Sequence, residues 1–297
     1  MTADTSLGLK TYNASVQDYF ELLKPRVMSL VVFSGFAGMW LAPGFENLHP
    51  ILIFTATLCI ALNAGAAGAI NMWYDRDIDN VMNRTKDRPL PKGKIPPDEA
   101  LSFGIVLTIL STMTMGIALN WLAAGILAFA NFFYVVIYTM WLKRSTPQNI
   151  VIGGTAGAFP PIIGWAAVTG DITTASIALF AIIFFWTPPH FWALSLFANE
   201  DYKRAKVPMM PITHGERHTK FQMIAYTLIL LPITLLPTYL GIAGTIYGIS
   251  AFLLSSFFIG TAILVWRDEK LKSAKRMFGY SVFYLFALFL MLMIDKV

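Results

Sequence analysis

The fold of this chain is decided by residues 50–79, which read PILIFTATLCIALNAGAAGAI (50–70) and then NMWYDRDID (71–79). The first part is predominantly apolar and close to the ~20 residues that an α-helix needs to cross a bilayer. The second part is polar and acidic, and a basic loop follows it. The stretch therefore predicts a membrane-spanning helix that ends in a group of polar side chains at the membrane surface.

The composition of the whole chain supports this interpretation. It has 297 residues, of which 56% are hydrophobic and 13% are charged, and its mean hydropathy is +0.61. A soluble domain has roughly a quarter charged residues, so this is an integral membrane protein. Nine apolar runs approach the spanning length, at about 28–42, 50–70, 100–119, 121–141, 149–168, 173–196, 221–241, 245–266 and 277–294. We predict an all-α fold of nine membrane-spanning helices, the first of them the shortest.

The positions of the basic residues predict the orientation. With the N-terminus in the cytoplasm, every Lys and Arg residue except Lys296 falls on the cytoplasmic side. This is the bias that the positive-inside rule describes, and one span more or fewer would mix the charges across the membrane. The net charge of +5 reflects this topology. We therefore expect a lipid bilayer as the surroundings, and no binding of nucleic acid.

Cysteine usage and the N-terminal residues restrict the class of protein further. The single cysteine, Cys59, lies within the second span, which excludes an internal disulfide and a multi-cysteine metal site. The first 24 residues contain three acidic side chains and two cations, unlike a transit peptide or a cleavable signal. We expect a bacterial inner membrane protein with a cytoplasmic N-terminal arm at 1–23 and one nine-helix domain at 24–297.

Three polar residues after the second span stand at helical spacing. Asn71, Asp75 and Asp79 are four residues apart, so a helix would present one amide and two carboxylates in one row. Asp77 would point elsewhere. Because the row begins where the apolar run ends, we expect it at the membrane boundary, with the carboxylates solvated until a ligand binds.

The loop after this row is basic. Arg84 and Arg88 are suited to bidentate contacts with phosphate, and they would share a face if the segment were helical. Lys86 is a less important candidate. Carboxylates alone would repel a diphosphate, whereas carboxylates that hold Mg²⁺ can bind one through the metal. The pattern predicts a Mg²⁺-diphosphate site, in which the two arginines grip the diphosphate.

The second long cytoplasmic loop follows the sixth span and begins NEDYKRAK (199–206). Tyr202 and Lys206 would share a face if this segment were helical. Its position after span six resembles that of the first motif after span two. We therefore predict that Asp201, Tyr202 and Lys206 contribute to the same polar site.

Spans five and six contain small residues, paired prolines and one histidine. Gly153 and Gly157 have the spacing that lets membrane helices approach closely. The pairs at 160–161 and 188–189 free backbone carbonyls, which indicates either a plain kink or a widened cavity. His190 is the only histidine within a span. Its side chain could be buried and hydrogen-bonded within the bundle, or it could contact a bound ligand, and the sequence leaves both roles open.

These motifs resemble one known family. NMWYDRDID (71–79) has the N-x-x-x-D-x-x-x-D form of the UbiA superfamily of intramembrane prenyltransferases. Together with RTKDRPLP (84–91), it is similar to the branch that farnesylates haem, the protohaem IX farnesyltransferases or haem O synthases. Further matching segments are KPRV (24–27), residues 153–165, PPHFW (188–192), DYKR (201–204) and PMMP (208–211). The resemblance covers nearly all of the chain from Lys24 onward, and the family fold is nine helices around a central cavity.

The resemblance implies a specific reaction. The family transfers a farnesyl group from farnesyl diphosphate to a vinyl group of protohaem IX, and water supplies the resulting hydroxyl. Haem would be a substrate, Mg²⁺ would be the cofactor, and a haem A synthase is a candidate downstream partner.

The resemblance also implies roles for individual residues. Asn71, Asp75 and Asp79 match the Mg²⁺-diphosphate motif. In place of a second D-x-x-x-D motif, Asp201 is followed four residues later by Ala205, so Lys206 would replace one metal ion with a fixed ammonium. The other implied substrate contacts are Lys24, Arg26, Arg84, Lys86, Arg88, Tyr202 and His190, the last as a haem contact or axial ligand.

Two other functions remain open at the level of sequence. One is a sister enzyme that prenylates an aromatic quinone precursor. The other is a secondary transporter with broken helices. The spans contain almost no ionisable residues besides His190, and the charged groups gather at one face. Both features are unfavourable for transport, which requires a route through both faces.

Overall fold

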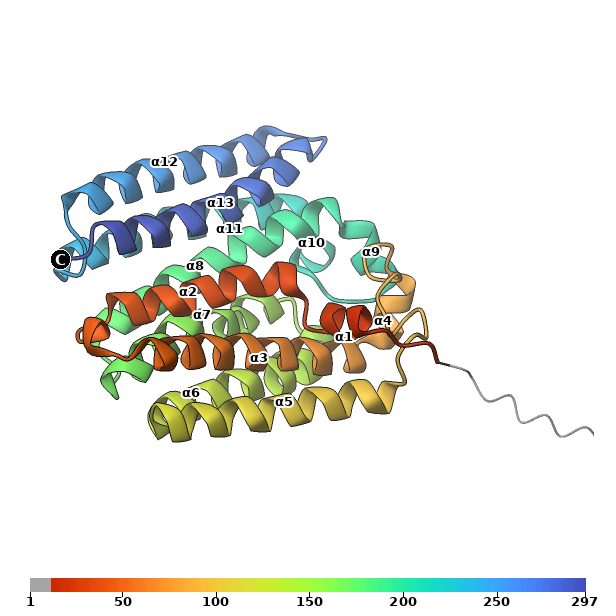
Figure 1. Cartoon of the computed structure of the whole chain (residues 1–297). Coiled ribbons are helices and arrows are strands. Elements are labelled where there is room, and N and C mark those ends of the chain that lie inside the picture. Colours follow the sequence, from red (N-terminus) through yellow and green to blue (C-terminus); the bar gives the residue numbers. More distant parts are fainter. Residues whose placement is uncertain (1–11) are drawn as a thin grey trace, which may run out of the picture.

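The computed structural model describes residues 12–297, and every named element in this range is helical (Figure 1). The long helices are α2 (Pro25–Leu41), α3 (Pro50–Tyr74), α5 (Pro97–Ala118), α6 (Trp121–Phe132), α7 (Asn149–Thr169), α8 (Thr174–Phe197), α11 (Gly215–Tyr239), α12 (Thr245–Arg267) and α13 (Lys272–Ile294). A π-helical segment, Phe133–Trp141, continues α6. The short helices are α1 (Val16–Leu22), α4 (Arg76–Val81), α9 (Asn199–Arg204) and α10 (Met210–Thr213).

The number of spans agrees with the sequence. Within the described range, eight helices are long and apolar enough to cross a membrane. The ninth is α2, which has 17 residues and forms a bent span with α1 at an angle of 56°. The protein is therefore a multi-pass membrane protein, and the helix of the predicted first span, α2, is long enough to cross a membrane only together with α1.

Local sequence explains where several spans begin. Pro25, Pro50 and Pro97 occupy the first helical position of α2, α3 and α5, where their missing N–H costs no hydrogen bond. Asn120, predicted as a one-residue connection, caps α6 by accepting a hydrogen bond from the N–H of Ala123 at 2.9 Å. These residues fix the ends of helices that apolar composition alone leaves undefined.

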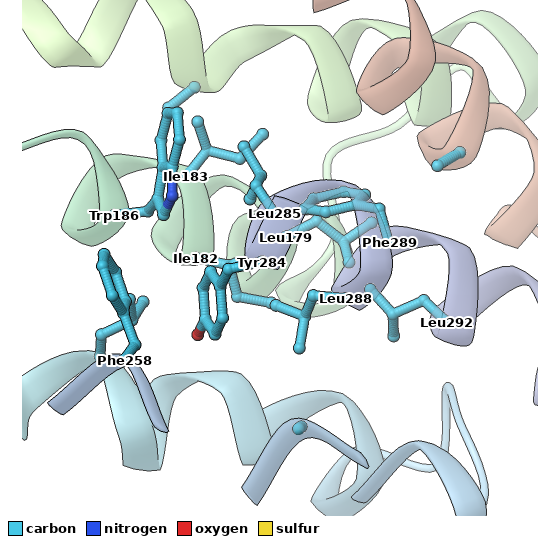
Figure 2. Packing of buried hydrophobic residues seen from close by; sticks show 14 of the residues in the cluster. Leu179, Ile182, Ile183, Trp186, Phe258, Tyr284, Leu285, Leu288, Phe289 and Leu292 are labelled. Atoms are coloured by element: carbon cyan, nitrogen blue, oxygen red, sulfur yellow. The ribbon is translucent and has the colours of Figure 1, made fainter. Parts of the chain in front are cut away.

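Helices α8 and α13 form the largest shared core, with α12 beside them (Figure 2). Its buried side chains include Leu179, Ile182, Ile183 and Trp186 of α8, Phe258 of α12, and Tyr284, Leu285, Leu288, Phe289 and Leu292 of α13. The indole of Trp186 donates to the carbonyl of Ser281 at 2.8 Å. Because lipid is as apolar as these side chains, close packing and hydrogen bonds hold the helices together.

Helices α2 and α7 approach each other through glycines. A Cβ added to Gly164 would lie 2.0 Å from the carbonyl oxygen of Gly35, and one added to Gly38 would lie 2.2 Å from that of Pro161. No Cβ fits at such distances, so the two backbones are in direct contact. This contact fixes α2, whose N-terminal end carries Lys24, against the centre of the bundle.

Only one glycine of the predicted pair, Gly153 and Gly157, packs closely against a neighbouring side chain. A Cβ on Gly153 would meet the ring of Tyr138 at 2.2 Å, whereas nothing lies within 4 Å of a Cβ on Gly157. The packing prediction is therefore confirmed for Gly153 and wrong for Gly157, because no neighbouring helix covers that point of α7. The proline pairs at 160–161 and 188–189 are buried, and neither pair ends its helix.

We expect Gly164→Ala to destabilise the protein by about 1–3 kcal/mol, because backbone must move to admit the methyl group. Gly157→Ala, in the same helix, is the matched control. It adds the same atoms in open space and should be neutral or slightly stabilising. Melting temperatures of the two variants in one detergent test this. Equal melting temperatures would show that the α2–α7 contact is not tight.

The short helices α1, α4, α9 and α10 gather at one end of the bundle (Figure 1). The described part of the predicted N-terminal arm packs there, with Leu22 buried and Asp18 paired with Lys94 at 2.6 Å. Residues 1–11 of that arm lie outside the described residues. The polar chemistry is thus concentrated at one end, the end at which the sequence places the cytoplasm.

Candidate active site

Asn71, Asp75 and Asp79 lie in one row where α3 passes into α4. The backbone N–H of Asp75 donates to the carbonyl of Asn71 at 2.9 Å, and the N–H of Asp79 donates to the carbonyl of Asp75 at 2.8 Å. Hydrogen bonding of the helical type therefore continues through Asp75, although α3 ends just before it. The predicted alignment of the three residues is confirmed.

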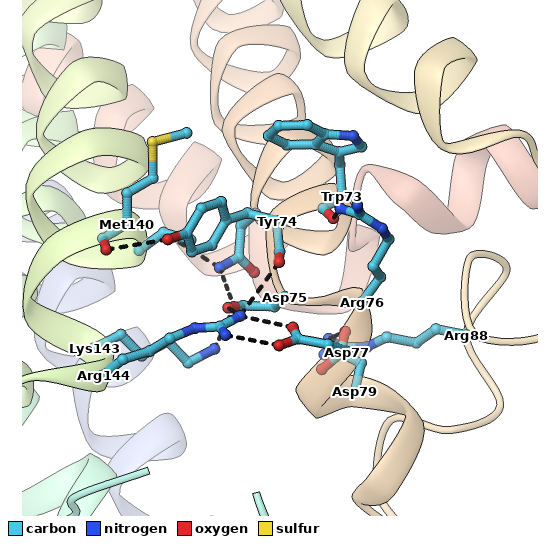
Figure 3. A network of polar contacts seen from close by, with 12 residues as sticks. Trp73, Tyr74, Asp75, Arg76, Asp77, Asp79, Arg88, Met140, Lys143 and Arg144 are labelled. Carbon is cyan, nitrogen blue, oxygen red and sulfur yellow. Dashed lines mark hydrogen bonds and ion pairs between the residues drawn. The ribbon is translucent and has the colours of Figure 1, made fainter. Parts of the chain in front are cut away.

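The row is buried. Asn71 is 4% exposed, Asp75 is 0% exposed and Asp79 is 2% exposed. The carboxylate of Asp75 pairs with the ammonium of Lys143, and its other oxygen lies 3.4 Å from the guanidinium of Arg144 (Figure 3). The expectation that both carboxylates are solvated is therefore wrong, because both are buried and basic side chains from the end of the fourth span cover Asp75.

The second carboxylate has its own cation. Arg88 donates to Asp79 at 2.7 Å, and the hydroxyl of Thr85 donates to the carbonyl of Asp79 at 3.1 Å. The segment between α4 and α5 consists of turns, so the argument that Arg84 and Arg88 share a helix face is wrong. Arg88 reaches the row because the turns fold the loop back over α4.

Lys24 enters the same cluster from α2. It adopts a left-handed backbone conformation directly before the helix (φ 53°), and its ammonium donates to the amide oxygen of Asn71 at 2.5 Å. Lys24 is half-buried, and the charge of Arg88 disfavours its charged form. An anion that bound here would favour the charged ammonium. Together, Lys24, Arg88, Lys143 and Arg144 form what we call the cation ring around the two buried carboxylates.

Asp77 points away from the row, as the helical spacing predicts. Its side chain is 61% exposed and forms two hydrogen bonds of 2.7 Å with the guanidinium of Arg144. That contact lowers the pKa of the Asp77 carboxyl. The same guanidinium lies 5.0 Å from the centre of the Tyr74 ring. Asp77 therefore orients Arg144 at the rim of the site.

Sequence reasoning missed Lys143 and Arg144 as site residues. In the sequence they are two cations after an apolar span, which the positive-inside rule explains without a further role. The π-helical segment before them places the hydroxyl of Thr139 3.0 Å from the Nδ2 atom of Asn71, which donates to it. Such π-helical turns are frequent at functional sites, but they are not predictable from hydropathy.

The second cytoplasmic loop meets the first through Asp201. Its carboxylate accepts a hydrogen bond from the backbone N–H of Arg84 at 3.1 Å and pairs with Arg204. Tyr202 is buried between the two loops, and burial raises the pKa of its hydroxyl. Lys206 lies after the end of α9, exposed and with φ 53°. The predicted shared face of Tyr202 and Lys206 is therefore wrong, because the helix ends at Arg204.

Two further predicted contacts lie apart from the cluster. Arg26 is exposed near the start of α2, and within residues 12–297 no hydrogen bond or ion pair joins its side chain to the cation ring. The ammonium of Lys86 donates to the side chain of Asn83 at 3.3 Å and is also exposed. Both residues carry cations on the surface around the site rather than within it.

A model of the UbiA prenyltransferase family matches residues 31–290. The chain belongs to the UbiA prenyltransferase family. The family match spans the bundle from α2 to α13 and includes the row and most of the cation ring.

Curated relatives of this UbiA family chain are similar over nearly its full length. The protoheme IX farnesyltransferase of Rhizobium johnstonii is 59% identical over 287 residues, which are 95% of this chain and 90% of the relative. The protoheme IX farnesyltransferase of Parvibaculum lavamentivorans is 54% identical over 286 residues, which are 95% of this chain and 89% of the relative.

Solved structures support the same fold. One reported for digeranylgeranylglyceryl phosphate synthase has a TM-score of 0.78 at 20% identity, and covers 94% of this chain and 98% of the other. A UbiA homologue from Archaeoglobus fulgidus, bound to DMAPP and Mg²⁺, has a TM-score of 0.67 at 18% identity. The match covers 93% of this chain and 99% of the homologue. The predicted nine-helix UbiA fold is confirmed.

The residues of this UbiA family chain are compatible with Mg²⁺. In the described range, no group of three or more His, Cys, Asp or Glu side chains is arranged to hold a metal. The row instead offers the carboxylates of Asp75 and Asp79 and the amide oxygen of Asn71. Mg²⁺ requires only one or two carboxylates when substrate phosphates and waters complete its shell. The fit requires that Lys143 and Lys24 leave the oxygens they contact.

His190 is buried between two aromatic rings. Its ring centre lies 4.3 Å from that of Trp186 and 4.6 Å from that of Phe278, both in stacked arrangements. Its Nδ1 atom is 2.6 Å from the hydroxyl of Ser281. Of the two possibilities left open by the sequence, this contact with α13 is the buried hydrogen bond. The geometry favours a packing role over a haem ligand.

We expect His190→Ala to lower stability by about 2–4 kcal/mol, because it leaves a cavity between Trp186 and Phe278. The affinities for both substrates should then fall alike. Ser281→Ala is the matched control, since it removes the hydrogen bond and keeps the stacked rings. Melting curves and titrations of each substrate against folded variants test this. A selective loss of haem binding at an unchanged melting temperature would contradict the packing role.

Proposed function

We propose that this chain transfers a farnesyl group from farnesyl diphosphate to a vinyl group of protohaem IX, giving haem O. The observation that best supports prenyl transfer is the position of Asn71, Asp75 and Asp79. The row is buried within the cation ring at one end of an apolar bundle. The haem acceptor is supported by relatives named protoheme IX farnesyltransferase at 54–59% identity.

We propose Mg²⁺ as the cofactor, held by Asp75, Asp79 and Asn71. When bound, it would neutralise the diphosphate and stabilise it as a leaving group. The A. fulgidus homologue with DMAPP and Mg²⁺ supports this assignment. Lys143 and Arg88, which now neutralise the carboxylates, would be released toward the diphosphate oxygens. The site would then keep its charge balance as the ligand enters.

The reaction breaks the bond between the allylic carbon and the diphosphate oxygen. The resulting carbocation would be attacked by the haem vinyl group, and water would add to the second cation with loss of one proton. Aromatic faces stabilise such cations. The rings of Tyr134 and Tyr138, whose centres are 5.4 Å apart, are on the same π-helical segment as Thr139 and therefore close to the row.

The remaining predicted contacts form an outer shell in this proposal. Arg84 and Tyr202 lie where the two polar loops meet, and Asp201 fixes the backbone of Arg84. Lys86, Lys206 and Arg26 are exposed around them and would attract the anionic substrates.

We also propose the orientation and membrane. The cation ring and both polar loops would face the cytoplasm of a bacterial inner membrane, because nearly all Lys and Arg residues lie at that end. A haem A synthase remains a candidate partner that would receive the product. A transporter is disfavoured, because transport requires a route through both faces, whereas the charged groups of the row and the cation ring lie at one end of the bundle.

An assay with purified protein tests the proposed function. Farnesyl diphosphate is offered with protohaem IX or with 4-hydroxybenzoate, and products are identified by mass. Haem O should form only with protohaem IX, and only when Mg²⁺ is restored after treatment with a chelator. Farnesylated 4-hydroxybenzoate would support the quinone-precursor alternative. No product with either acceptor would overturn both assignments.

A further inference from the structure

A cavity lies at the polar end, apart from the row. Its volume is about 710 Å³, and it is bordered by the end of α8, by α9, by the start of α11 and by the start of α13. Eight of its eleven lining residues are polar or charged, and the three apolar ones are Leu196, Phe197 and Leu271. None of the residues in the row or the cation ring lines it. The row and the cation ring therefore leave this cavity unused.

The lining is strongly basic. Its cations are Lys203, Lys270, Lys272, Lys275 and Arg276, against two carboxylates, Glu200 and Glu216. Lys203 and Glu200 neutralise each other at 2.9 Å. Within residues 12–297, the four cations of the α13 end have no ion-pair partner. The cavity thus keeps an excess of positive charge, whereas the cation ring of the active site is largely neutralised by carboxylates.

The turn before α13, which contains Lys270, is held in place. Asp268 accepts hydrogen bonds from the N–H of Lys270 at 2.9 Å and from the N–H of Ser273 at 2.7 Å. The buried ammonium of Lys220 donates to the carbonyl of Asp268 at 2.9 Å. Leu271 adopts a left-handed conformation there (φ 56°), which costs energy for a branched side chain. These hydrogen bonds order the turn that contains Lys270 and the start of α13, which carries the other three cations.

The arrangement at α13 opposes ordinary helix electrostatics. Acidic side chains are favourable in the first turn of a helix, because its N-terminus carries a partial positive charge. The first turn of α13 contains no acidic residue, and its N-terminal end carries Lys272, Lys275 and Arg276. The positive-inside rule accounts for cations on this side of the membrane. It does not account for their concentration around one cavity that has only two carboxylates in its lining.

We propose that this cavity binds the phosphate-bearing headgroup of an anionic phospholipid. The cavity lies at the ends of membrane-spanning helices, where headgroups are the most abundant anions, and basic pockets between such helices are typical headgroup sites. Phe197 is 39% exposed and, with Leu196 and Leu271, offers a small apolar surface to the adjoining glycerol and acyl carbons.

Lipid binding to matched variants tests the proposal. The pocket variant is Lys272→Gln, Lys275→Gln and Arg276→Gln. The control variant, Lys92→Gln, Arg217→Gln and Arg267→Gln, removes the same charge from cations that do not line the cavity. Native mass spectrometry of detergent-purified protein measures the affinity for phosphatidylglycerol and for phosphatidylcholine with the same acyl chains. Melting curves confirm folding, and a double variant, Lys270→Gln with Arg276→Gln, replaces the triple variant if that one fails to fold.

We expect the pocket variant to bind phosphatidylglycerol about tenfold or more weakly than wild type, since it lacks three of the cations that attract the headgroup. The control variant should bind like wild type, and phosphatidylcholine should bind all forms alike. Equal affinity of both variants for phosphatidylglycerol would overturn the proposal. Displacement of the bound lipid by millimolar inorganic phosphate would assign the cavity to a free anion and would also overturn it.

Discussion

Asp75→Asn should lower kcat/KM for farnesyl transfer by at least about a hundredfold, because it removes one charged metal ligand from the centre of the row. Asp75 is 0% exposed and paired with Lys143, so an alanine would also leave a cation without its partner. Asparagine keeps the volume and an oxygen acceptor for Lys143. It therefore separates the loss of the metal ligand from a loss of folding.

Asp77→Asn is the matched control for this variant. Asp77 is two residues away and contacts Arg144, but its side chain is 61% exposed and points out of the row. We expect transfer within a few-fold of wild type and an unchanged requirement for Mg²⁺. Turnover by Asp75→Asn at the wild-type rate would contradict a metal role for the row. Equal losses in the two variants would indicate a general electrostatic effect instead.

Arg88→Ala should weaken the binding of farnesyl diphosphate by about 1.5–3 kcal/mol, the value of a charge-assisted hydrogen bond, or roughly ten- to 150-fold in KM. The guanidinium already lies 2.7 Å from Asp79, next to the place where Mg²⁺ on that carboxylate would hold a diphosphate. The loss should appear mainly in KM for farnesyl diphosphate, with the apparent affinity for haem nearly unchanged.

Lys86→Ala controls for the loss of a cation from the same loop. Its ammonium contacts Asn83 and remains exposed, so we expect a change of less than a few-fold. Steady-state kinetics with each substrate varied in turn distinguish the two variants. Unchanged KM in Arg88→Ala would exclude a diphosphate contact. A selective loss of haem affinity would assign Arg88 to the haem propionates.

The fold was accessible from sequence because its determinants are local. Apolar runs of spanning length and the charge bias at their ends predict nine spans, and the structure agrees at each of them. The row of Asn71, Asp75 and Asp79 was also predictable, since it depends only on helical spacing. The resemblance of the same residues to the UbiA family pointed to the prenyltransferase reaction.

The surroundings of the row could not be predicted, because they depend on contacts between distant segments. Lys143 reaches Asp75 from the end of another span, through a π-helical turn that changes the register of the chain. Lys206 has the spacing of a partner for Tyr202, but α9 ends before it. Helix ends and π-turns depend on tertiary packing. A spacing of four residues therefore predicts the neighbour of Asn71 correctly at Asp75, but it predicts the neighbour of Tyr202 wrongly at Lys206.

A structure of the protein with Mg²⁺ and a non-reactive thio analogue of farnesyl diphosphate tests the central claim most directly. The account predicts Mg²⁺ between the diphosphate and the carboxylates of Asp75 and Asp79. Arg88 should contact the diphosphate, and Lys143 should have moved from Asp75 toward it. A diphosphate bound elsewhere, with Lys143 still paired to Asp75, would contradict the account.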